Sequence, residues 1–376
     1  MSDFQDLIIH RLEDRINAGA MSAAAVRIEK IGDLLLDWAG GTSEFDLNSQ
    51  PVNTGSIFHV ASISKPMVTS AFVKLIEQGL VDAEDPVAKF VPEFAKNGKE
   101  AVTLMHCLTH SSGLPDMVPG NIELRKRNAP LSEFVAAACQ TELLFPPGTD
   151  VLYQSSGILM LAEVAERVTS VPFREFLSTE IFEPSGMESS HLGWRPEFES
   201  RTVAAKTNMT NLAWRSGGYE TENSEDTNNW NHNSLYWRNI GSPWGGVHTT
   251  TADIGRLMQI MLNHGVSSSG QKVFEPGTVR MLLSDYTAAQ PLMPDEIRLR
   301  DGWGLGWRIQ RLASDWAYGS AVPAGAFGHY GATGTVTWAD PASGIIFVLL
   351  TNGLHSLEAA TLKACGNIAA AALCAE

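Results

Sequence analysis

The sequence has few cysteines, and the four that it has are scattered. Cys107, Cys139, Cys365 and Cys374 form no C-x-x-C pair and lack the spacing of metal ligands. Free, buried thiols in a reducing cytosol are therefore expected.

Long apolar runs are also missing. The strongest run, residues 345–350, has the length of a buried strand rather than of a membrane span. Residues 1–7 contain neither a basic region nor a long apolar region, so they do not resemble a secretory signal. These absences, together with the scattered cysteines, predict a cytoplasmic protein with no membrane partner.

Basic residues are scarce relative to acidic ones. The 27 Lys and Arg face 42 Asp and Glu, which gives a formal net charge of −15. Such a charge argues against nucleic acid or an anionic membrane as the main partner. Aromatic residues make up only 8%, but 10 of them are Trp, which suggests aromatic-lined surfaces.

No internal repeat or low-complexity linker divides the 376 residues, and 44% apolar content can fill a large core. The hydrophobic periodicity predicts helices and strands in a clear order. We expect helices over residues 1–20, 131–139, 159–168 and 357–372, and strands over 23–30, 34–39, 304–310, 334–339 and 345–351.

This order predicts an α+β fold, in which strands from both ends of the chain build one antiparallel sheet flanked by helices. Residues 1–79 and 288–376 would form the sheet domain. Residues 80–287 would form an inserted, mostly helical lobe. A cleft between two such lobes is a common place for a ligand site.

The segment Ser62-Ile63-Ser64-Lys65 places a hydroxyl and an amine three residues apart at the start of an expected helix. At that spacing both side chains lie on one helical face. A serine needs an adjacent base to become a nucleophile, and a buried lysine of lowered pKa can serve. From this motif alone, Ser62 could equally be a helix cap with Lys65 in solvent. Apolar residues at helical spacing after Pro66 favour a buried helix, which leaves both roles open.

Two further motifs carry polar groups. Tyr153-Gln154-Ser155 lies in a loop just before an expected helix, where tyrosine and serine can face one cavity or simply pack on the surface. His329-Tyr330-Gly331-Ala332-Thr333-Gly334 surrounds a strand edge with glycines. Glycines there allow the backbone to approach a ligand, and a backbone N–H could stabilise an oxyanion. A glycine-rich bulge with a structural histidine is the alternative.

Together, in this order and spacing, the three motifs resemble the class C β-lactamase-like serine hydrolases. S-x-x-K is also known from class A β-lactamases and penicillin-binding proteins. This superfamily includes family VIII carboxylesterases, D-aminopeptidases, D-amino acid amidases and nylon-oligomer hydrolases. The resemblance covers most of the chain and extends to residues 58–61, 79–87, 107–115, 181–187, 245–247, 250–253 and 304–307.

The resemblance implies roles for individual residues. Ser62 would be the nucleophile, and Lys65 would take its proton or hold its hydroxyl in place. Tyr153 would share the acid–base work and protonate the leaving group. The backbone N–H groups of Ser62 and Ala332 would form the oxyanion hole.

The chain departs from the β-lactamase pattern at two positions. Ser155 stands where asparagine is usual, and His329 stands where lysine begins Lys-Thr-Gly. A neutral histidine presents no fixed charge to a substrate carboxylate. Ser155, His329 and Gly331 are therefore expected to bind substrate in a site closer to the esterase and D-aminopeptidase branches.

Other candidate sites have less support. His106 and His110 are four residues apart, but no third ligand is evident, so no metal and no cofactor are expected. Residues 228–233, with Trp237 and Trp244, could wall the acyl pocket or form a surface loop. Asp253 is expected at a helix N-terminus rather than in catalysis.

The sequence thus predicts a serine hydrolase with an acyl-serine intermediate, acting on small or medium acyl esters. Alternatives with the same chemistry are an amidase or D-aminopeptidase, a weak β-lactamase and an acyltransferase. An alternative of another class is a non-catalytic binding module with the penicillin-binding-protein fold. The expected partner is a small ester or amide, and the sequence does not specify an oligomeric state.

Overall fold

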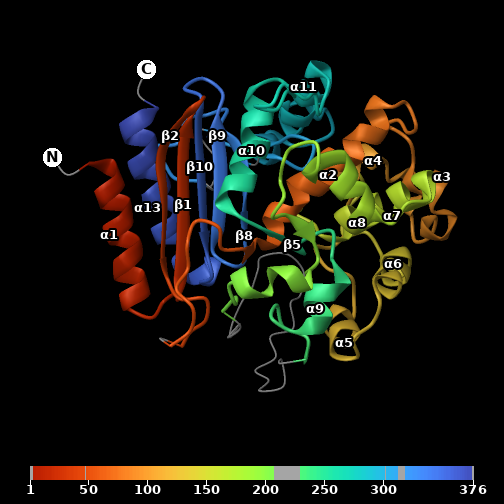
Figure 1. Ribbon diagram of the computed structural model, residues 1–376. Helices are drawn as coiled ribbons and strands as arrows, with labels where there is room; N and C mark the ends of the chain where they lie inside the picture. Colours follow the sequence, from red (N-terminus) through yellow and green to blue (C-terminus); the bar gives the residue numbers. More distant parts are fainter. Residues whose placement is uncertain (1–2, 47, 207–228, 301, 312–317, 375–376) are drawn as a thin grey trace.

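The computed structural model describes residues 3–46, 48–206, 229–300, 302–311 and 318–374. It is a mixed α/β structure in which an antiparallel sheet lies between helices (Figure 1). The sheet has the order β2-β1-β10-β9-β8-β7-β6. Its strands are β1 (Ala23–Lys30), β2 (Asp33–Gly41), β6 (Gly302–Trp303), β7 (Arg308–Ile309), β8 (Phe327–Gly331), β9 (Thr335–Asp340) and β10 (Ile345–Thr351).

The two ends of the chain meet inside this sheet. β1 pairs with β2 on one side and with β10 on the other, so that Val26 lies opposite Leu349. The strands expected over residues 23–30 and 345–351 are confirmed with these bounds. The predicted α+β fold with a sheet built from both termini is therefore confirmed.

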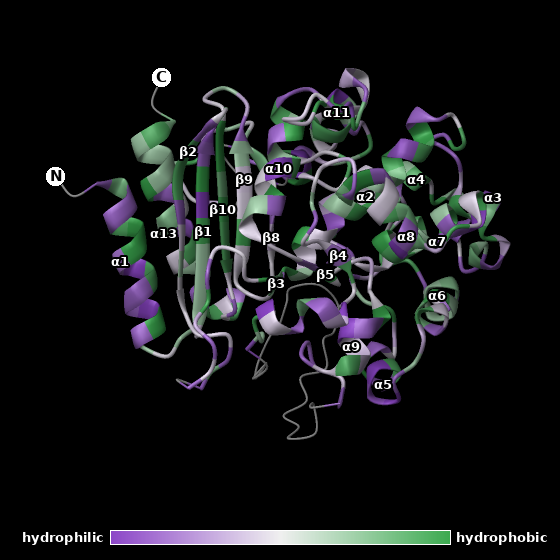
Figure 2. Cartoon of the chain, in the orientation of Figure 1, coloured by the Kyte–Doolittle hydropathy of each residue, from purple (hydrophilic) through white to green (hydrophobic). Residues whose placement is uncertain are grey.

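Strand β10 is buried on both faces, which explains its continuous apolar sequence. Ile345, Phe347 and Leu349 belong to the core beneath one face, and the alternate residues Ile346 and Val348 belong to the core of the other. Successive side chains of a strand point to opposite faces, so a fully buried strand is apolar at every position. Figure 2 shows this central part of the sheet as strongly hydrophobic.

Helices cover both faces of the sheet (Figure 1). α1 (Phe4–Asn17) and α13 (His355–Leu373) pack together on one face, and α10 (Thr251–Leu262) packs on the other. Asp253 lies in the first turn of α10, as expected, and its carboxylate accepts the N–H of Ser189. α10 belongs to residues 80–287, which were expected to form the helical lobe, but it packs on the sheet. The domain boundaries drawn from the sequence therefore remain a prediction.

The remaining helices lie beside the sheet. α2 is their central element, and it is buried along almost its whole length, as the apolar spacing after Pro66 predicts. The helices are α2 (Ser64–Glu77), α3 (Val87–Phe90), α4 (Leu104–Leu108), α5 (Asn121–Lys126), α6 (Leu131–Gln140), α7 (Ser156–Thr169), α8 (Phe173–Leu177), α9 (Leu235–Ile240), α11 (Pro276–Leu283) and α12 (Asp295–Arg300).

A small antiparallel sheet lies next to the N-terminal end of α2. It has the order β3-β5-β4, with β3 (Phe58–His59), β4 (His191–Leu192) and β5 (Val247–Thr249). β3 leads directly into the turn that precedes α2. This sheet therefore fixes the position of the segment that carries Ser62.

One expected strand is wrong. Residues 304–310 do not form a single strand, because the chain turns between β6 and β7. Gly306 has a positive φ of 77°, and a Cβ at this position would collide with the side chain of Thr69 on α2. The glycines therefore allow a tight turn against α2 rather than an extended strand.

Among the described residues, no helix combines the length and the apolar character that a membrane span requires.

Candidate active site

Ser62 lies in a strained turn at the start of α2. It is in a short 3₁₀ helix, Ala61–Ile63, and Ala61 has a φ of +45°. Ser64 secures the turn, since its Oγ donates to the Ala61 carbonyl (2.6 Å) and accepts the Val247 N–H (2.9 Å). Non-glycine residues with positive φ are costly and concentrate at functional sites. The strained turn therefore holds the Ser62 hydroxyl in one defined place.

Lys65 is fully buried beside this hydroxyl. Its Nζ donates to Ser62 Oγ (3.1 Å) and to the Trp244 carbonyl (2.8 Å), and the residue is only 1% exposed. Burial lowers the pKa of Lys65 to about 7, although the negative charge of Asp116 acts in the opposite direction. A large share of the Lys65 side chains is therefore neutral at neutral pH and able to accept a proton.

Tyr153 faces the same amine from the loop before α7. The centroid of its ring lies 4.6 Å from Lys65 Nζ. Its ring also contacts His110 and Trp303, with centroid separations of 5.0 and 5.9 Å. His110 is itself held in place, because its Nδ1 accepts the Gln154 N–H (3.2 Å). These contacts fix the phenol beside the Ser62–Lys65 pair.

The end of β8 is tied to the segment that precedes Ser62. Thr333 Oγ1 donates to the His59 carbonyl (2.7 Å), and Thr335 Oγ1 donates to the Val60 carbonyl (3.1 Å). Gly331 fits against Val60 with no room for a side chain. Ala332 is thereby positioned on the same pocket wall as Ser62.

Replacing Gly331 with alanine is expected to displace this strand end. The new Cβ would collide with the Val60 carbonyl oxygen and with Thr335 Oγ1, and the backbone atom cannot swing aside. We expect a loss of stability of about 1–3 kcal/mol and at least a tenfold loss of hydrolysis. Urea unfolding and ester hydrolysis measure the two effects.

Gly277→Ala on α11 is the matched control, because its new Cβ would meet only a side-chain nitrogen of Arg280 at 3.6 Å. Wild-type activity in Gly331→Ala would contradict the assigned role of this strand end.

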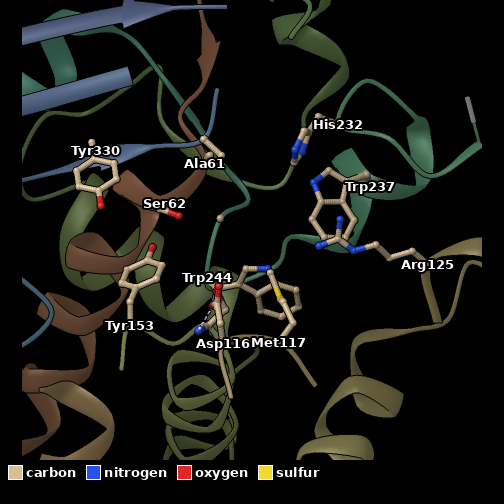
Figure 3. A pocket seen from close by; sticks show the side chains of 13 residues that line it. Ala61, Ser62, Asp116, Met117, Arg125, Tyr153, His232, Trp237, Trp244 and Tyr330 are labelled. Carbon is tan, nitrogen blue, oxygen red and sulfur yellow. Dashed lines mark hydrogen bonds between the residues drawn. The ribbon is translucent and has the colours of Figure 1, made fainter. Parts of the chain in front are cut away.

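A pocket opens at Ser62, and its volume is about 110 Å³. A single water needs roughly 10–15 Å³ by such a measure, so the pocket has room for a small organic group. Figure 3 shows Tyr153 and Tyr330 near Ser62 at one end and Arg125 with Trp237 at the other. The lining residues are Ala61, Ser62, Asp116, Met117, Arg125, Tyr153, Ser155, His232, Trp237, Trp244, Gly245, Tyr330 and Ala332.

The structure brings most of the sequence-predicted site residues to this pocket. Ser62, Tyr153, Ser155 and Ala332 line it, and Lys65 lies directly behind Ser62. His232, Trp237 and Trp244 also line it, in agreement with the pocket-wall interpretation of that segment. Asn228, which began the same segment, lies outside the described residues.

Four lining residues were not anticipated from the sequence: Asp116, Met117, Arg125 and Tyr330. Tyr330 could have been found from the alternation of side chains along β8. No sequence signal identifies the other three, because their segment has no motif and reaches the pocket only through tertiary packing.

His329 does not line the pocket. It is 1% exposed and lies behind Tyr153, with ring centroids 5.8 Å apart. Its Nδ1 accepts the Tyr330 N–H (2.9 Å). Burial, together with the nearby Lys65, lowers the pKa of His329 to about 3. His329 is therefore neutral and gives β8 no fixed positive charge.

His106 and His110 have structural hydrogen bonds. His106 Nδ1 accepts the Thr103 N–H (3.1 Å) in a capping box at α4, and His110 supports Tyr153 as described above. Within the described ranges, no group of three His, Cys, Asp or Glu side chains could hold a metal ion.

Three buried histidines lie next to one another in the small sheet, and the half-buried His232 lies beside them. His248 on β5 pairs in register with His59 on β3 and with His191 on β4, and the His232 ring is tilted against that of His59 with centroids 4.9 Å apart. Burial lowers the pKa of His59 and His191 to about 4, and lowers those of His232 and His248 well below the ordinary value. All four are therefore neutral at pH 7.

These histidines are expected to make the fold sensitive to acid. Between about pH 6.5 and 4 the unfolded chain binds protons that the folded chain does not, so the free energy of unfolding falls as the pH falls. The lowered pKa of His59 alone corresponds to a loss of about 3 kcal/mol in the free energy of unfolding once the pH is below both pKa values. Urea midpoints at pH 7.5, 6 and 5 measure the effect.

His59→Gln is expected to flatten this pH dependence, whereas His10→Gln on the exposed face of α1 leaves it unchanged. An equal urea midpoint at pH 7.5 and pH 5 for the wild type would contradict the prediction.

Comparison with known proteins places this chain in a family. The family model described as Beta-lactamase matches residues 5–370. A Salmonella agona protein, provisionally named D-alanyl-D-alanine carboxypeptidase, is 28% identical over 94% of this chain and 84% of its own length.

Two solved structures show the same fold. EstCE1, described as a hydrolase with promiscuous acyltransferase activity, has a TM-score of 0.75 at 18% identity over 97% of this chain and 98% of its own. A family VIII carboxylesterase has a TM-score of 0.72 at 18% identity over 97% of both chains. A match that spans nearly all of the sequence, on a fold with the same architecture, shows that this chain belongs to the β-lactamase family of serine hydrolases.

Proposed function

We propose that this protein is a carboxylesterase that acts on small to medium acyl esters through an acyl-serine intermediate. One observation carries the proposal: the buried Lys65 amine, with its pKa lowered to about 7, lies 3.1 Å from Ser62 Oγ. A base at this distance and of this pKa can accept the serine proton near neutral pH.

In the proposed reaction, Ser62 Oγ attacks the ester carbonyl carbon as its proton passes to Lys65 Nζ. The oxygen that becomes negative is held by the backbone N–H groups of Ser62 and Ala332. Tyr153 protonates the departing alkoxide and regains a proton from Lys65, which completes an acyl-serine and leaves the Lys65 amine neutral again. Water then attacks the acyl carbon as its proton passes to Lys65 Nζ. When the acid is released, Lys65 returns this proton to Ser62 Oγ, which restores the free serine.

The neutral His329 on β8 supports an ester substrate rather than a β-lactam or a C-terminal peptide. Substrates of the latter two classes carry a carboxylate near the bond that is cleaved. A fixed cation beside that bond would recognise this carboxylate, but the buried, neutral His329 supplies none. Ser155 is retained as a substrate-binding residue in this proposal because it lines the pocket.

An amidase or peptidase remains the second candidate, because the Salmonella agona relative carries a peptidase name. Hydrolysis of p-nitrophenyl acetate and butyrate, D-alanyl p-nitroanilide and nitrocefin tests the two. Turnover of the p-nitrophenyl esters alone is the expected result. Turnover of the anilide without the esters would replace the proposal with an aminopeptidase, and turnover of nitrocefin alone would replace it with a β-lactamase.

Adding an alcohol such as methanol tests for acyl transfer, since a transferase would release p-nitrophenol and form the methyl ester in preference to the acid. A complete lack of turnover together with no labelling by a fluorophosphonate would favour a binding module.

We also propose that the protein works in the cytoplasm. All four cysteines are free thiols, and Cys107, Cys139 and Cys365 are buried. Disulfides are rare and free thiols persist where the medium is reducing.

A further inference from the structure

Arg125 is a basic residue in the wall of the pocket that contains Ser62. It comes from α5, and its side chain enters the pocket at the end opposite Tyr153 and Tyr330 (Figure 3). The indole of Trp237 and the imidazole of His232 lie at the same end of the pocket (Figure 3). An acyl chain that extends along the pocket from the carbonyl carbon bonded to Ser62 Oγ would therefore approach the Arg125 guanidinium.

The guanidinium is held in a fixed orientation. Its central carbon lies 3.8 Å from the centroid of the Trp237 ring, in contact with the ring face. Its Nε donates to Asn121 Oδ1 on the same helix (3.2 Å). Trp237 is 3% exposed, so the surface under the guanidinium is itself fixed by packing. A guanidinium ordered in advance loses little conformational entropy when a ligand binds.

The opposite charges in the pocket are separated. Among the described lining residues the acid is Asp116, and its negative charge acts on Lys65 at the reaction centre. Its Oδ1 accepts the Ser155 N–H (2.8 Å). The positive charge of Arg125 lies at the far end, among the Trp237 and His232 rings. Among the described lining residues, the acidic side chain thus lies near the reaction centre and the guanidinium lies at the far end.

We propose that Arg125 binds a carboxylate at the far end of the acyl group, so that the preferred substrates are monoesters of dicarboxylic acids. This inference rests on the proposed esterase function, because it takes the acyl group to lie between Ser62 and Arg125. A planar guanidinium can donate two parallel hydrogen bonds to a carboxylate, which fixes both the distance and the orientation of the acyl chain. An uncharged acyl chain of equal length gains no such contact.

The test compares paired substrates. Mono-p-nitrophenyl glutarate and adipate carry the terminal carboxylate, and p-nitrophenyl pentanoate and hexanoate are their uncharged counterparts. For each pair the ratio of kcat/KM is measured for the wild type, Arg125→Met and Arg125→Lys. We expect the wild type to favour the anionic ester of the better-fitting length by about 10- to 100-fold, the range of a charge-assisted hydrogen bond.

Arg125→Met keeps an unbranched chain against Trp237 and is expected to abolish this preference. Arg125→Lys is expected to keep only part of it, because an ammonium lacks the planar pair of donors. Arg127→Met is the matched control. Arg127 lies two residues after Arg125, directly after the end of α5, but it is exposed and pairs with Glu133 outside the pocket. Its substrate ratio should equal that of the wild type.

Equal kcat/KM for charged and uncharged esters in the wild type would overturn the inference, as would a preference that survives in Arg125→Met. Hydrolysis of the uncharged esters tests the proposed function separately. If neither ester is hydrolysed, titration with adipate decides, because a carboxylate on Arg125 changes the surroundings of Trp237. Saturable quenching of tryptophan fluorescence in the wild type and in Ser62→Ala, absent in Arg125→Met, supports the carboxylate site, and no quenching in the wild type overturns it.

Discussion

Replacing Ser62 with alanine is expected to lower kcat/KM for p-nitrophenyl butyrate by about 10³-fold or more, since loss of a serine nucleophile typically has an effect of this size or larger. The proposed acyl-serine cannot form without Oγ, and no other group can form this intermediate. The fold should persist, because Ser62 is only partly buried and the turn is held by Ser64.

Intact-mass spectrometry after treatment with a fluorophosphonate gives a second measurement that does not depend on turnover. The wild type should gain one phosphonyl group and Ser62→Ala none. Ser64→Ala is the contrasting control: it should still be labelled, but it should unfold at a lower temperature because its two buried hydrogen bonds are lost. Undiminished hydrolysis by Ser62→Ala would refute the proposed mechanism.

Replacing Lys65 with methionine is expected to lower kcat/KM by about 10²- to 10⁴-fold, the usual range for loss of a general base. In the wild type, activity should rise with pH and level off above an apparent pKa near 7, because only the neutral amine accepts the Ser62 proton. An unperturbed lysine would place this rise near pH 10.4. The residual activity of Lys65→Met should lack the rise at pH 7.

Thermal unfolding controls for damage to the fold in this variant. Burial disfavours the charged amine, so an apolar side chain of similar length should be tolerated at position 65. Lys74→Met on the same helix is the matched control, because Lys74 pairs with Glu77 away from the pocket. A pH profile of Lys65→Met with an unchanged rise near pH 7 would assign the titration to another group.

The long strands could be predicted from the sequence because each has a local pattern that decides its environment. The apolar run 345–350 is uninterrupted since both faces of β10 are buried, and the residues of β1 likewise alternate between the two cores. The failure at 304–310 has a tertiary cause. Glycine and tryptophan there satisfy a strand pattern, but the packing of Gly306 against Thr69 requires a turn, and Thr69 is far away in sequence.

The meeting of Ser62, Lys65 and Tyr153 could also be predicted, because these residues occur in motifs with defined spacing. Ser62 and Lys65 share a helix face, and Tyr153 was suggested by the family resemblance. Their catalytic roles are still predictions, which the variants above will test. The position of His329 was harder to foresee. Tyr330 on β8 lines the pocket, so the alternation of side chains along the strand turns the neighbouring His329 away from it.

The position of Arg125 at the far end of the pocket could not be predicted. Arg125 comes from a segment without a motif, and Trp237, which the sequence suggested as a pocket wall, is more than a hundred residues further along the chain. Their meeting depends on how α5 and α9 are brought together in the fold. The residues proposed to set specificity are therefore brought together by tertiary packing, whereas those proposed to carry out the chemistry occur in short sequence motifs.

The pairing of β1 with β10 also bears on how the protein is made. Roughly 300 residues separate the end of β2 from the start of β10, so a ribosome working at about 5–20 residues per second needs about 15–60 s to supply the missing partner. During this time β1 has one edge unpaired, which is a risk for aggregation. Arg27 and Glu29, which form an ion pair on one face of β1, make this unpaired strand less prone to aggregate. Biosynthesis in this family member thus depends on keeping its first hairpin soluble until its last strand emerges.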